Sequence, residues 1–498
     1  MSYLGLDIGT GGCKAAAFNP SGQELASAFR EYSVVYPSSG HAELDPDEVI
    51  NKCFEVIRNV NTRIADPVMA MSISSQGEAF TAIDVNGKAL CNAMVSSDFR
   101  ASKIAFEWSR EFGEEKIYYI TGHTPHPLFS LFKILWLKEN RPDLWNRANY
   151  FLCFEDLFHY RLGLDPKISW PLAGRTMMFD VTRHKWSRDI LDAMGLVPGK
   201  LAFPVPSGEI SGTISMEAGN KLGFKNPVII VAGGHDQTCA ALGAGVIEPG
   251  LCMYATGSVE CFCPMFDQPR FSEDLRLKNL CCYDYSIKGK YTTVAYSLTG
   301  GNILRWVRDE LGEMELHEAR ETGKNPYNLL LDEMPGSPTE LHVLPYFSAT
   351  GTPYFDTRAR GVIMGLQHST KKGEITKALL EGVAMEMKLN LAIMEKSGMK
   401  VHTFIATGGG TRHNAWTQLK ADILNRKIII RETSEAGCYG AAILAQSAHE
   451  GIPILELHPR VSPERIFIPD MEKAALYQQK YEVYNQMYPL LKRFWEKE

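Results

Sequence analysis

Two segments, one at the start of the chain and one just past its midpoint, share a pattern of apolar strand, glycine-containing tip and second strand. The first is GLDIGTGGCKAAAF, residues 5–18, and the second is MYATGSVECFC, residues 253–263. Glycine tolerates positive φ, so each segment predicts a tight hairpin. A chain of 498 residues is too long for one hydrophobic core. The repetition therefore predicts two similar domains, residues 1–247 and 248–498, separated at the turn IEPGLC.

Strand-like and helix-like segments alternate along nearly the whole chain, which indicates an α/β fold. Residues 46–60 predict a helix, with Asp45 as the N-cap before Pro46. PVIIVAGGHDQTCAALGAG, residues 227–245, predicts a buried strand, a glycine turn and a helix of small residues. From Asp470 onward the chain predicts an amphipathic helix that packs against the protein.

Composition excludes several classes of function. A net charge of −6 does not favour binding to nucleic acid or to a membrane surface. No apolar run is long enough to span a bilayer, and no basic region followed by an apolar core opens the chain. The eleven cysteines lie in apolar segments, which predicts reduced thiols and a cytoplasmic protein. Cys261 with Cys263, and Cys281 with Cys282, lack zinc-ligand spacing and are interpreted as core thiols.

Polar side chains and glycines collect where predicted strands end, which is where open α/β sheets bind ligands. In the first hairpin, Asp7 can hold hydrated Mg²⁺ and Lys14 can meet a phosphate, although a plain hairpin with two solvated charges fits this stretch equally well. Two further strand ends, SSQGEAF and SSDFR, supply hydrogen-bonding groups for several hydroxyls. Their polar side chains are Gln76, Glu78, Asp98 and Arg100.

Two glycine turns complete the set. GGHDQ places Asp236 directly after a buried strand, in the position of a general base. FIATGGGTRHNAWTQLKADIL lets a planar ring or a phosphate approach the backbone closely. Each of these stretches alone is explained by an ordinary loop. Together, the two hairpins, the hydroxyl-binding cluster and the base aspartate indicate transfer of phosphate to an alcohol.

These segments resemble the FGGY carbohydrate kinases, which share their wider fold with actin and heat-shock ATPases. The hairpins are similar to the family's two phosphate loops, and GVIMGLQHSTKKGEITKALLEG, residues 361–382, resembles its long C-terminal signature. SLFKILWLKEN resembles the mid-chain signature, and ATGGGTRHNAWTQLKADILNR and GCYGAAILA resemble the adenosine-side segments. The resemblance implies two similar actin-like (ribonuclease H-like) domains flanking a catalytic cleft, with ATP and Mg²⁺ as cofactors.

By position, the resemblance implies a role for each of the following residues. Asp236 is the base, Asp7 serves the metal-bound nucleotide, and the sugar contacts are Gln76, Gly77, Glu78, Asp98, Arg100, Asp236 and Gln237. The phosphate and nucleotide contacts are Thr10, Gly11, Gly12, Lys14, Gly257, Ser258, Gly301, Arg305, Gly409, Gly410 and Asn414. His413 departs from the family's usual residue at a further nucleotide position.

GHAELDPDEV, residues 40–49, resembles xylulokinases, which implies a ketopentose such as xylulose as the substrate. Gly77-Glu78 and Gln237 depart from the xylulokinase pattern, so L-fuculose, L-xylulose and polyols stay open. Gly77, Ser96 and Leu128 replace the bulky residues of glycerol kinases, which predicts a wider pocket that holds glycerol poorly. An ATPase of the actin or chaperone type is the alternative from another class, and a homodimer is a possible assembly.

Overall fold

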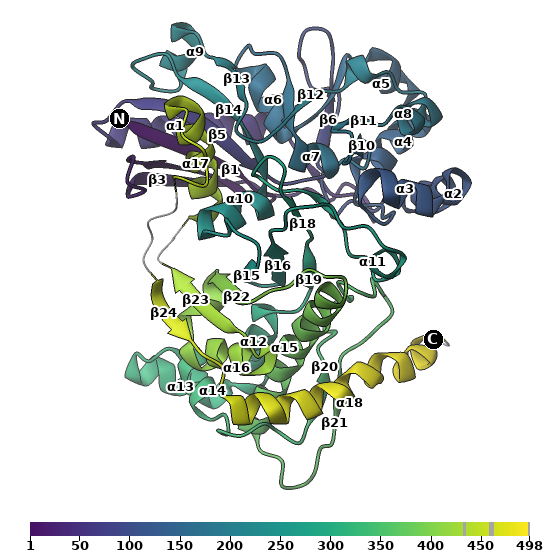
Figure 1. Cartoon of the computed structure of the whole chain (residues 1–498), viewed down its shortest axis with the longest axis vertical. Coiled ribbons are helices and arrows are strands. Elements are labelled where there is room, and N and C mark those ends of the chain that lie inside the picture. The colour runs from purple at the N-terminus through teal and green to yellow at the C-terminus, as the bar shows by residue number, and fades with distance from the viewer. Residues whose placement is uncertain (432–434, 458–462, 497–498) are drawn as a thin grey trace.

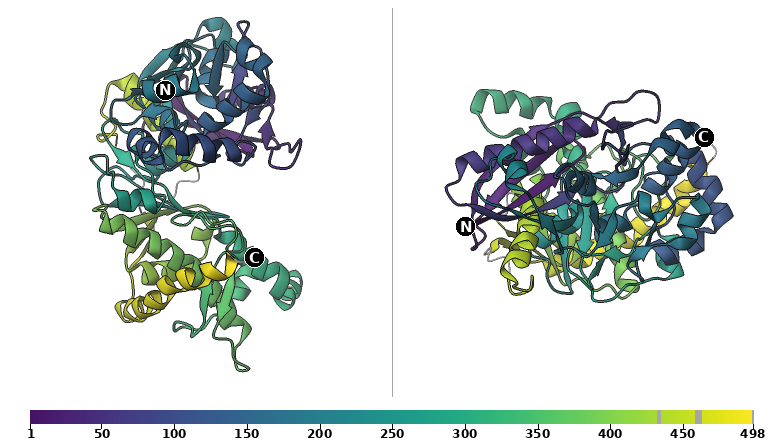
Figure 2. Two further views of the ribbon diagram at one scale, coloured as in Figure 1. Left: turned by 90° about the vertical axis from the view of Figure 1, so that its right-hand side faces the viewer. Right: turned by 90° about the horizontal axis from the view of Figure 1, so that it is seen from above.

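A computed structural model describes residues 1–431, 435–457 and 463–496 of the chain. The chain forms two lobes joined by a narrower middle (Figures 1 and 2). Residues up to about 247 lie in the upper lobe of Figure 1, and most of the later residues lie in the lower lobe.

The upper lobe is built on a six-stranded sheet with the order β13-β14-β5-β1-β2-β3. The strands β1, β5 and β14 run parallel, whereas β2, β3 and β13 pair antiparallel at the two sides. Its members are β1 (Ser2–Ile8), β2 (Gly12–Phe18), β3 (Glu24–Glu31), β5 (Val68–Ser75), β13 (Ile210–Thr213) and β14 (Ile229–His235).

The lower lobe repeats this arrangement in the order β19-β16-β15-β22-β23-β24. Here β15, β22 and β23 are parallel, and the outer strands are antiparallel. Its members are β15 (Leu251–Thr256), β16 (Glu260–Pro264), β19 (Ala295–Ser297), β22 (Thr403–Thr407), β23 (Lys427–Arg431) and β24 (Pro463–Phe467). Because each sheet opens with the predicted hairpin, β1–β2 or β15–β16, the α/β fold with two similar halves is confirmed.

Helices cover both sheets, and several form where the sequence predicts them. Asp45 caps α1 as predicted, since its side chain accepts from the backbone N–H groups of Asp47 and Glu48. The α-helices of the first half are α1 (Pro46–Arg63), α2 (Ser102–Phe112), α3 (Glu114–Thr121), α4 (Ser130–Asn140), α5 (Pro142–Arg147), α6 (Phe154–Arg161), α7 (Trp170–Gly174), α8 (Arg188–Met194), α9 (Met216–Lys221) and α10 (Asp236–Ala244). Those of the second half are α11 (Glu273–Leu277), α12 (Gly301–Trp306), α13 (Glu313–Thr322), α14 (Pro326–Asp332), α15 (Lys372–Lys396), α16 (Asn414–Leu424), α17 (Ala436–Glu450) and α18 (Met471–Trp495).

Smaller elements fill the remaining space. A four-stranded sheet in the upper lobe has the order β4-β7-β6-β8. Its strands are β4 (Glu43–Leu44), β6 (Phe80–Ile83), β7 (Ala93–Met94) and β8 (Tyr150–Cys153). The two-stranded pairs are β9 (Lys167–Ser169) with β12 (Phe203–Val205), β10 (Phe179–Asp180) with β11 (Lys185–Trp186), β17 (Tyr283–Asp284) with β18 (Tyr291–Thr292), and β20 (His342–Leu344) with β21 (Val362–Met364). Short non-α turns are η1 (Pro198–Lys200), η2 (Val307–Leu311) and η3 (Gly409–Arg412).

The helix α17 belongs to the second half in sequence but lies in the upper lobe (Figure 1). It fits there because glycines allow its backbone to touch its neighbours. A Cβ on Gly5 of β1 would lie 1.8 Å from the carbonyl oxygen of Cys438, and one on Gly440 would lie 1.9 Å from that of Cys239 in α10. One hydrophobic cluster therefore joins residues of both halves, including Tyr3 and Ile443.

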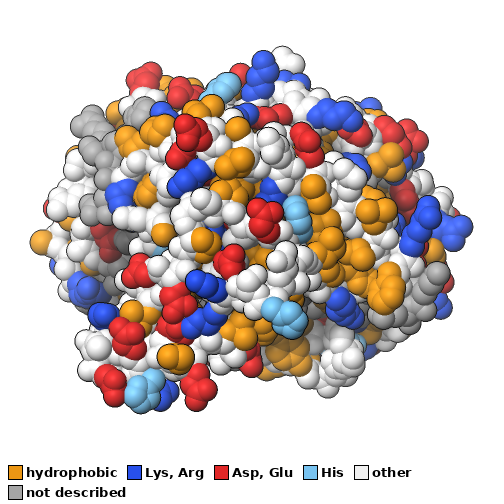
Figure 3. Space-filling model, turned by 90° about the horizontal axis from the view of Figure 1, so that it is seen from below, with side chains coloured by type: hydrophobic (Ala, Val, Ile, Leu, Met, Phe, Trp, Pro, Cys, Tyr) orange, Lys and Arg blue, Asp and Glu red, His pale blue; other side chains and the backbone are white. Residues whose placement is uncertain are grey.

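All eleven cysteines are free, and all but Cys91 are buried, as expected of core thiols. In the described part of the chain no helix combines the length and apolarity that crossing a membrane requires. Seen from below, the surface mixes acidic, basic and hydrophobic side chains rather than presenting one charge sign (Figure 3).

Candidate active site

The first hairpin carries its charged pair on neighbouring strands. Asp7 at the end of β1 lies opposite Lys14 on β2. Ser74 donates its hydroxyl to Asp7 Oδ1 at 2.5 Å, and burial raises the pKa of Asp7. A Cβ on Gly11 would meet no atom within 4 Å, so the tip is open to a ligand. A carboxylate and an ammonium beside exposed glycine backbone can receive a hydrated cation and a phosphate together.

Gln76, predicted to contact the sugar, hydrogen-bonds to this tip, and its contact with a sugar stays a prediction. Its Nε2 donates to the carbonyl of Gly9 at 2.9 Å, and its Oε1 accepts from the hydroxyl of Thr10 at 3.1 Å. Tyr32 donates to the same carbonyl at 2.7 Å. Both polar groups of the Gln76 side chain therefore help to fix the hairpin.

The start of α17 also reaches the first hairpin, a contact that no sequence signal indicated. Lys14 donates to Glu435, the residue just before α17, in a hydrogen-bonded ion pair. A Cβ on Gly437 would lie 3.2 Å from the carboxylate of Asp7. The charge of Glu435 adds to burial in raising the pKa of Asp7. Asp7, Lys14 and Glu435 thus form one cluster of charges.

The second hairpin tip is tied to the start of α12. Gly301 N–H donates to the carbonyl of Gly257 at 2.8 Å, and Arg305 Nη2 donates to Ser258 Oγ at 3.4 Å. The four residues Gly257, Ser258, Gly301 and Arg305, all predicted to contact the nucleotide, therefore lie together. The tip and the helix are about forty residues apart in the sequence. They form one wall of a pocket.

That pocket has a volume of about 330 Å³. Its lining is Thr256, Gly257, Ser258, Gly301, Leu304, Arg305, Tyr327, Gly409, Gly410, His413 and Trp416. Asn414 lies just outside it, where its Oδ1 accepts from Arg465 at 2.5 Å. The size and glycine-rich wall suit a nucleotide, since such sites span roughly 300–1,000 Å³.

A buried ion pair supports this pocket from behind. Lys420 Nζ lies 2.5 Å from Glu260 Oε1 and 4.0 Å from the ring centre of Trp416. Tyr254 also donates to Glu260. Because Glu260 follows the Ser258 tip on β16, this pair links the tip to the pocket wall made by α16.

Asp236 opens α10, directly after β14, as the sequence predicts. Its pKa is raised to about 7, mostly by burial and to a smaller extent by the charges of Asp7 and Glu78. His235 Nε2 lies 3.2 Å from Asp236 Oδ1, while its Nδ1 lies 2.9 Å from the hydroxyl of Tyr283. Apart from this contact with His235, Asp236 Oδ1 makes no hydrogen bond among the described residues, and neither does Gln237 Oε1, although both atoms are buried. Two neighbouring acceptors are therefore available to a donor such as a hydroxyl.

Glu78 is held by an arginine that the sequence did not indicate. Arg175 Nε donates to Glu78 Oε1 at 2.5 Å. The guanidinium lies 5.1 Å from the ring centre of Phe129 and 5.6 Å from that of Tyr283. Glu78 adopts φ 60°, a left-handed conformation that costs energy in a non-glycine residue. The surrounding structure thus fixes this carboxylate tightly.

The widening of the sugar pocket expected at Gly77 stays a prediction, although the space beside this glycine is crowded. A Cβ on Gly77 would lie 3.1 Å from side-chain carbons of both Arg175 and His235. The volume beside Gly77 is therefore filled by two other side chains. Ser96 and Leu128, the other two small replacements, are each half-buried.

Asp98 and Arg100 form a closed network. Arg100 Nε donates to Asp98 at 2.9 Å, and its Nη2 lies 2.5 Å from Glu43. The Asp98 carboxylate also accepts from the N–H of Ala42, and its side chain is 0% exposed. In this conformation the two side chains bind the protein rather than facing an open site, so their contact with a sugar stays a prediction.

Buried Lys133 connects the Glu78 turn to the neighbouring strand. Its Nζ donates to the carbonyls of Glu78 at 2.9 Å and Val95 at 3.0 Å. Burial lowers the pKa of Lys133 to about 8. It therefore fixes the backbone from which Glu78 projects.

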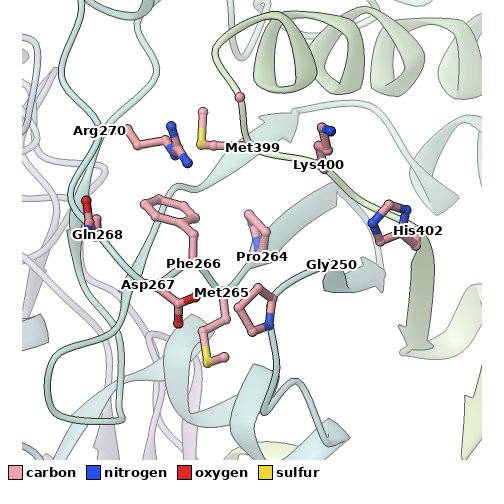
Figure 4. A pocket seen from close by; sticks show the side chains of 12 residues that line it. Gly250, Pro264, Met265, Phe266, Asp267, Gln268, Arg270, Met399, Lys400 and His402 are labelled. Carbon is pink, nitrogen blue, oxygen red and sulfur yellow. The ribbon is translucent and has the colours of Figure 1, made fainter.

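A second hollow, of about 450 Å³, lies near the turn between the two halves (Figure 4). Gly250 and His402 meet in it just before β15 and β22, respectively, and Arg270 and Lys400 also contribute to its lining. The nucleotide-sized pocket lies after the ends of the same two strands. The two hollows are therefore separated by the length of these strands, and the second is not part of the candidate active site.

Comparison with known proteins identifies the relatives of this chain. Sequence models of the FGGY family of carbohydrate kinases match residues 2–243 (N-terminal domain) and 253–449 (C-terminal domain). A xylulose kinase from Staphylococcus epidermidis is 27% identical over 98% of this chain and 97% of its own length. A gluconokinase from Bacillus subtilis is 28% identical over 89% of this chain and 86% of its own length. The crystal structure of a "xyloylose kinase" from Brucella ovis superposes with a TM-score of 0.89 at 25% identity, covering 99% of this chain and 100% of that one.

Proposed function

Because the chain belongs to the FGGY family of carbohydrate kinases, we propose that it transfers the terminal phosphate of MgATP to a hydroxyl of a neutral ketopentose such as xylulose. Two neighbouring buried acceptors carry this proposal: among the described residues, Asp236 Oδ1 has only the contact with His235, and Gln237 Oε1 has no hydrogen-bond partner. Burying such atoms without partners costs free energy, and sugar hydroxyls are donors that would satisfy them.

In the proposed reaction Asp236 accepts the proton of the attacking hydroxyl. The sugar oxygen forms a bond to the terminal phosphorus while the bond from that phosphorus to ADP breaks. The products are the sugar phosphate, ADP and a protonated Asp236, which returns its proton to water. Phosphoryl transfer needs mainly positioning and charge neutralisation of the reactants. One positioned carboxylate is therefore the only acid–base group that the protein has to supply.

The residues present suit the metal-bound nucleotide. Asp7 offers a carboxylate whose Oδ1 is oriented by Ser74, and Mg²⁺ is commonly held through one carboxylate and its own waters. When bound, the ion neutralises phosphate charge. We assign the terminal phosphates to Thr10, Gly11, Gly12 and Lys14, with the Gly257–Ser258 tip opposite, and the adenosine to the pocket of Gly301, Arg305, Gly409 and Gly410. Asn414 would act from just outside that pocket.

Gluconate is the second candidate, since gluconokinases are among the relatives. The charges near Asp236 favour a neutral sugar. Arg175 is already paired with Glu78. Burial lowers the pKa of His126 to about 4, and it holds the pKa values of His123 and His235 well below the usual range, so all three rings are neutral. The carboxylate of a sugar acid would thus lie near the carboxylates of Asp236 and Glu78. Neither Arg175 nor these three histidines would offer it a free positive charge.

The test is a panel of xylulose, L-xylulose, L-fuculose, gluconate, glycerol and longer polyols, each incubated with MgATP and read by mass spectrometry. We expect a ketopentose to give the highest kcat/KM. A gluconate kcat/KM above that of every ketose would overturn the substrate class. ATP hydrolysis without any phosphorylated sugar would overturn the kinase activity itself. A homodimer and a cytoplasmic location stay predictions.

A further inference from the structure

The unexpected ion pair at the first hairpin involves a residue from the opposite end of the chain. Glu435 is 421 positions from Lys14, and it precedes α17, which packs on the sheet that carries the hairpin. Lys14 and Glu435 are each less than one-third exposed, at 28% and 22%. The pair is thus held by the packing of α17 rather than formed by two free surface chains.

Without nucleotide, this cluster holds two carboxylates and one ammonium. Glu435 occupies Lys14, while Asp7 is hydrogen-bonded by the hydroxyl of Ser74. A phosphate group that arrives alone must compete with Glu435 for the ammonium and meets two negative charges. A phosphate that arrives with Mg²⁺ brings a cation for the two carboxylates, so Lys14 can turn to the phosphate at little electrostatic cost.

We propose that Glu435 is a positioning residue. By pairing with Lys14, it makes this lysine bind the phosphate of metal-bound nucleotide in preference to phosphate without a metal. It acts through Lys14 by competing with phosphate that lacks a divalent cation. The inference rests on the proposed kinase function, because it assumes that the terminal phosphates of ATP bind at the first hairpin.

The experiment measures nucleotide affinity by calorimetry in two states, ATP with excess Mg²⁺ and ATP with EDTA. Three full-length proteins are compared: wild type, Glu435→Gln, and the control Glu31→Gln. Glu31 is exposed and its backbone pairs with Gly12 of the same hairpin, so the control makes an equal charge change nearby. Thermal melting establishes that each variant is folded.

We expect Glu435→Gln to bind metal-free ATP about twofold to fivefold more tightly than wild type, the upper part of the range for loss of a partly exposed ion pair. Affinity for MgATP should change less than about twofold, and Glu31→Gln should match wild type. In a Lys14→Met background, Glu435→Gln should no longer improve the binding of metal-free ATP. This loss of effect would show that Glu435 acts through the lysine.

Two results would overturn the inference. Weaker MgATP binding with unchanged metal-free binding would make Glu435 a contributor to metal binding instead. Equal affinities in wild type and Glu435→Gln for both forms would leave it a purely structural contact. Failure of the proposed function would give a different result. No sugar in the panel would then be phosphorylated, while wild type and Glu435→Gln would still differ in their affinity for metal-free ATP.

Discussion

Replacing Asp236 by Asn tests the assignment of the general base. Asn keeps the shape of the side chain and still hydrogen-bonds a hydroxyl, but it cannot accept the proton. A positioned base contributes about 10²–10⁴-fold in rate, so turnover should fall by that amount while sugar affinity changes little. If Asp236 only capped α10, Asn would serve equally well and turnover would be nearly unchanged.

The pH dependence gives an independent measure. Only ionised Asp236 can act as base, and its pKa is raised to about 7, first by burial and then by Asp7 and Glu78. At pH 7 about half of the free enzyme is active, and at pH 6 about one molecule in eleven. The sugar kcat/KM should therefore fall about fivefold from pH 7 to pH 6 and about tenfold per unit below that.

The assay is steady-state kinetics between pH 5.5 and 8.5 with MgATP and sugar both below their KM values, so that the rate reports the free enzyme, alongside direct sugar-binding measurements. Asp192→Asn, an equal change on the exposed side of α8, serves as the control and should keep the wild-type profile. A flat wild-type profile across this range would refute the reasoning. So would an Asp236→Asn turnover within about threefold of wild type.

Four further predictions follow, one on the substrate and three on contacts within the protein. Glycerol should show a much lower kcat/KM than the best ketose, because a short triol is loosely oriented, and equal values in the coupled assay would contradict this. Gly437→Ala would place a Cβ 3.2 Å from the Asp7 carboxylate, so we expect weaker MgATP binding by calorimetry with little change in Tm; unchanged affinity would speak against close approach of α17. Gly5→Ala would place a Cβ 1.8 Å from the carbonyl oxygen of Cys438, so denaturant unfolding should show a loss of several kcal/mol, and wild-type stability would contradict the packing of α17 on β1. Glu260→Ala leaves Lys420 buried without its partner and should cost about 3–5 kcal/mol of stability in the same assay, whereas a loss under about 1 kcal/mol would contradict the described burial.

The repeated architecture could be predicted because its signals are local. Apolar strands and glycine tips can be recognised within short segments of the sequence, and both hairpins form at these segments. The nucleotide-sized pocket was also predictable, since its residues follow strand ends and strand ends meet at one edge of a sheet.

Contacts between distant segments could not be predicted in this way. Arg175 reaches Glu78 across 97 positions, and nothing in its own segment marks it as a partner of that carboxylate. Gln76 had the right residue type for a sugar contact, but the sequence could not show that Gly9 and Thr10 already bind its amide. Such pairings depend on how elements pack in three dimensions, not on the periodicity within any one of them.

The placement of α17 sets an order for biosynthesis. Its residues complete a hydrophobic cluster that begins with Tyr3, so the first lobe cannot close this core until residue 450 has left the ribosome. Translation from residue 247 to residue 450 takes about 10–40 s at 5–20 residues per second. During this interval the nascent upper lobe exposes the apolar face that α17 later covers. A chain that stops before Ala436 keeps that face uncovered, so we expect the first half expressed alone to aggregate or to remain bound to chaperones.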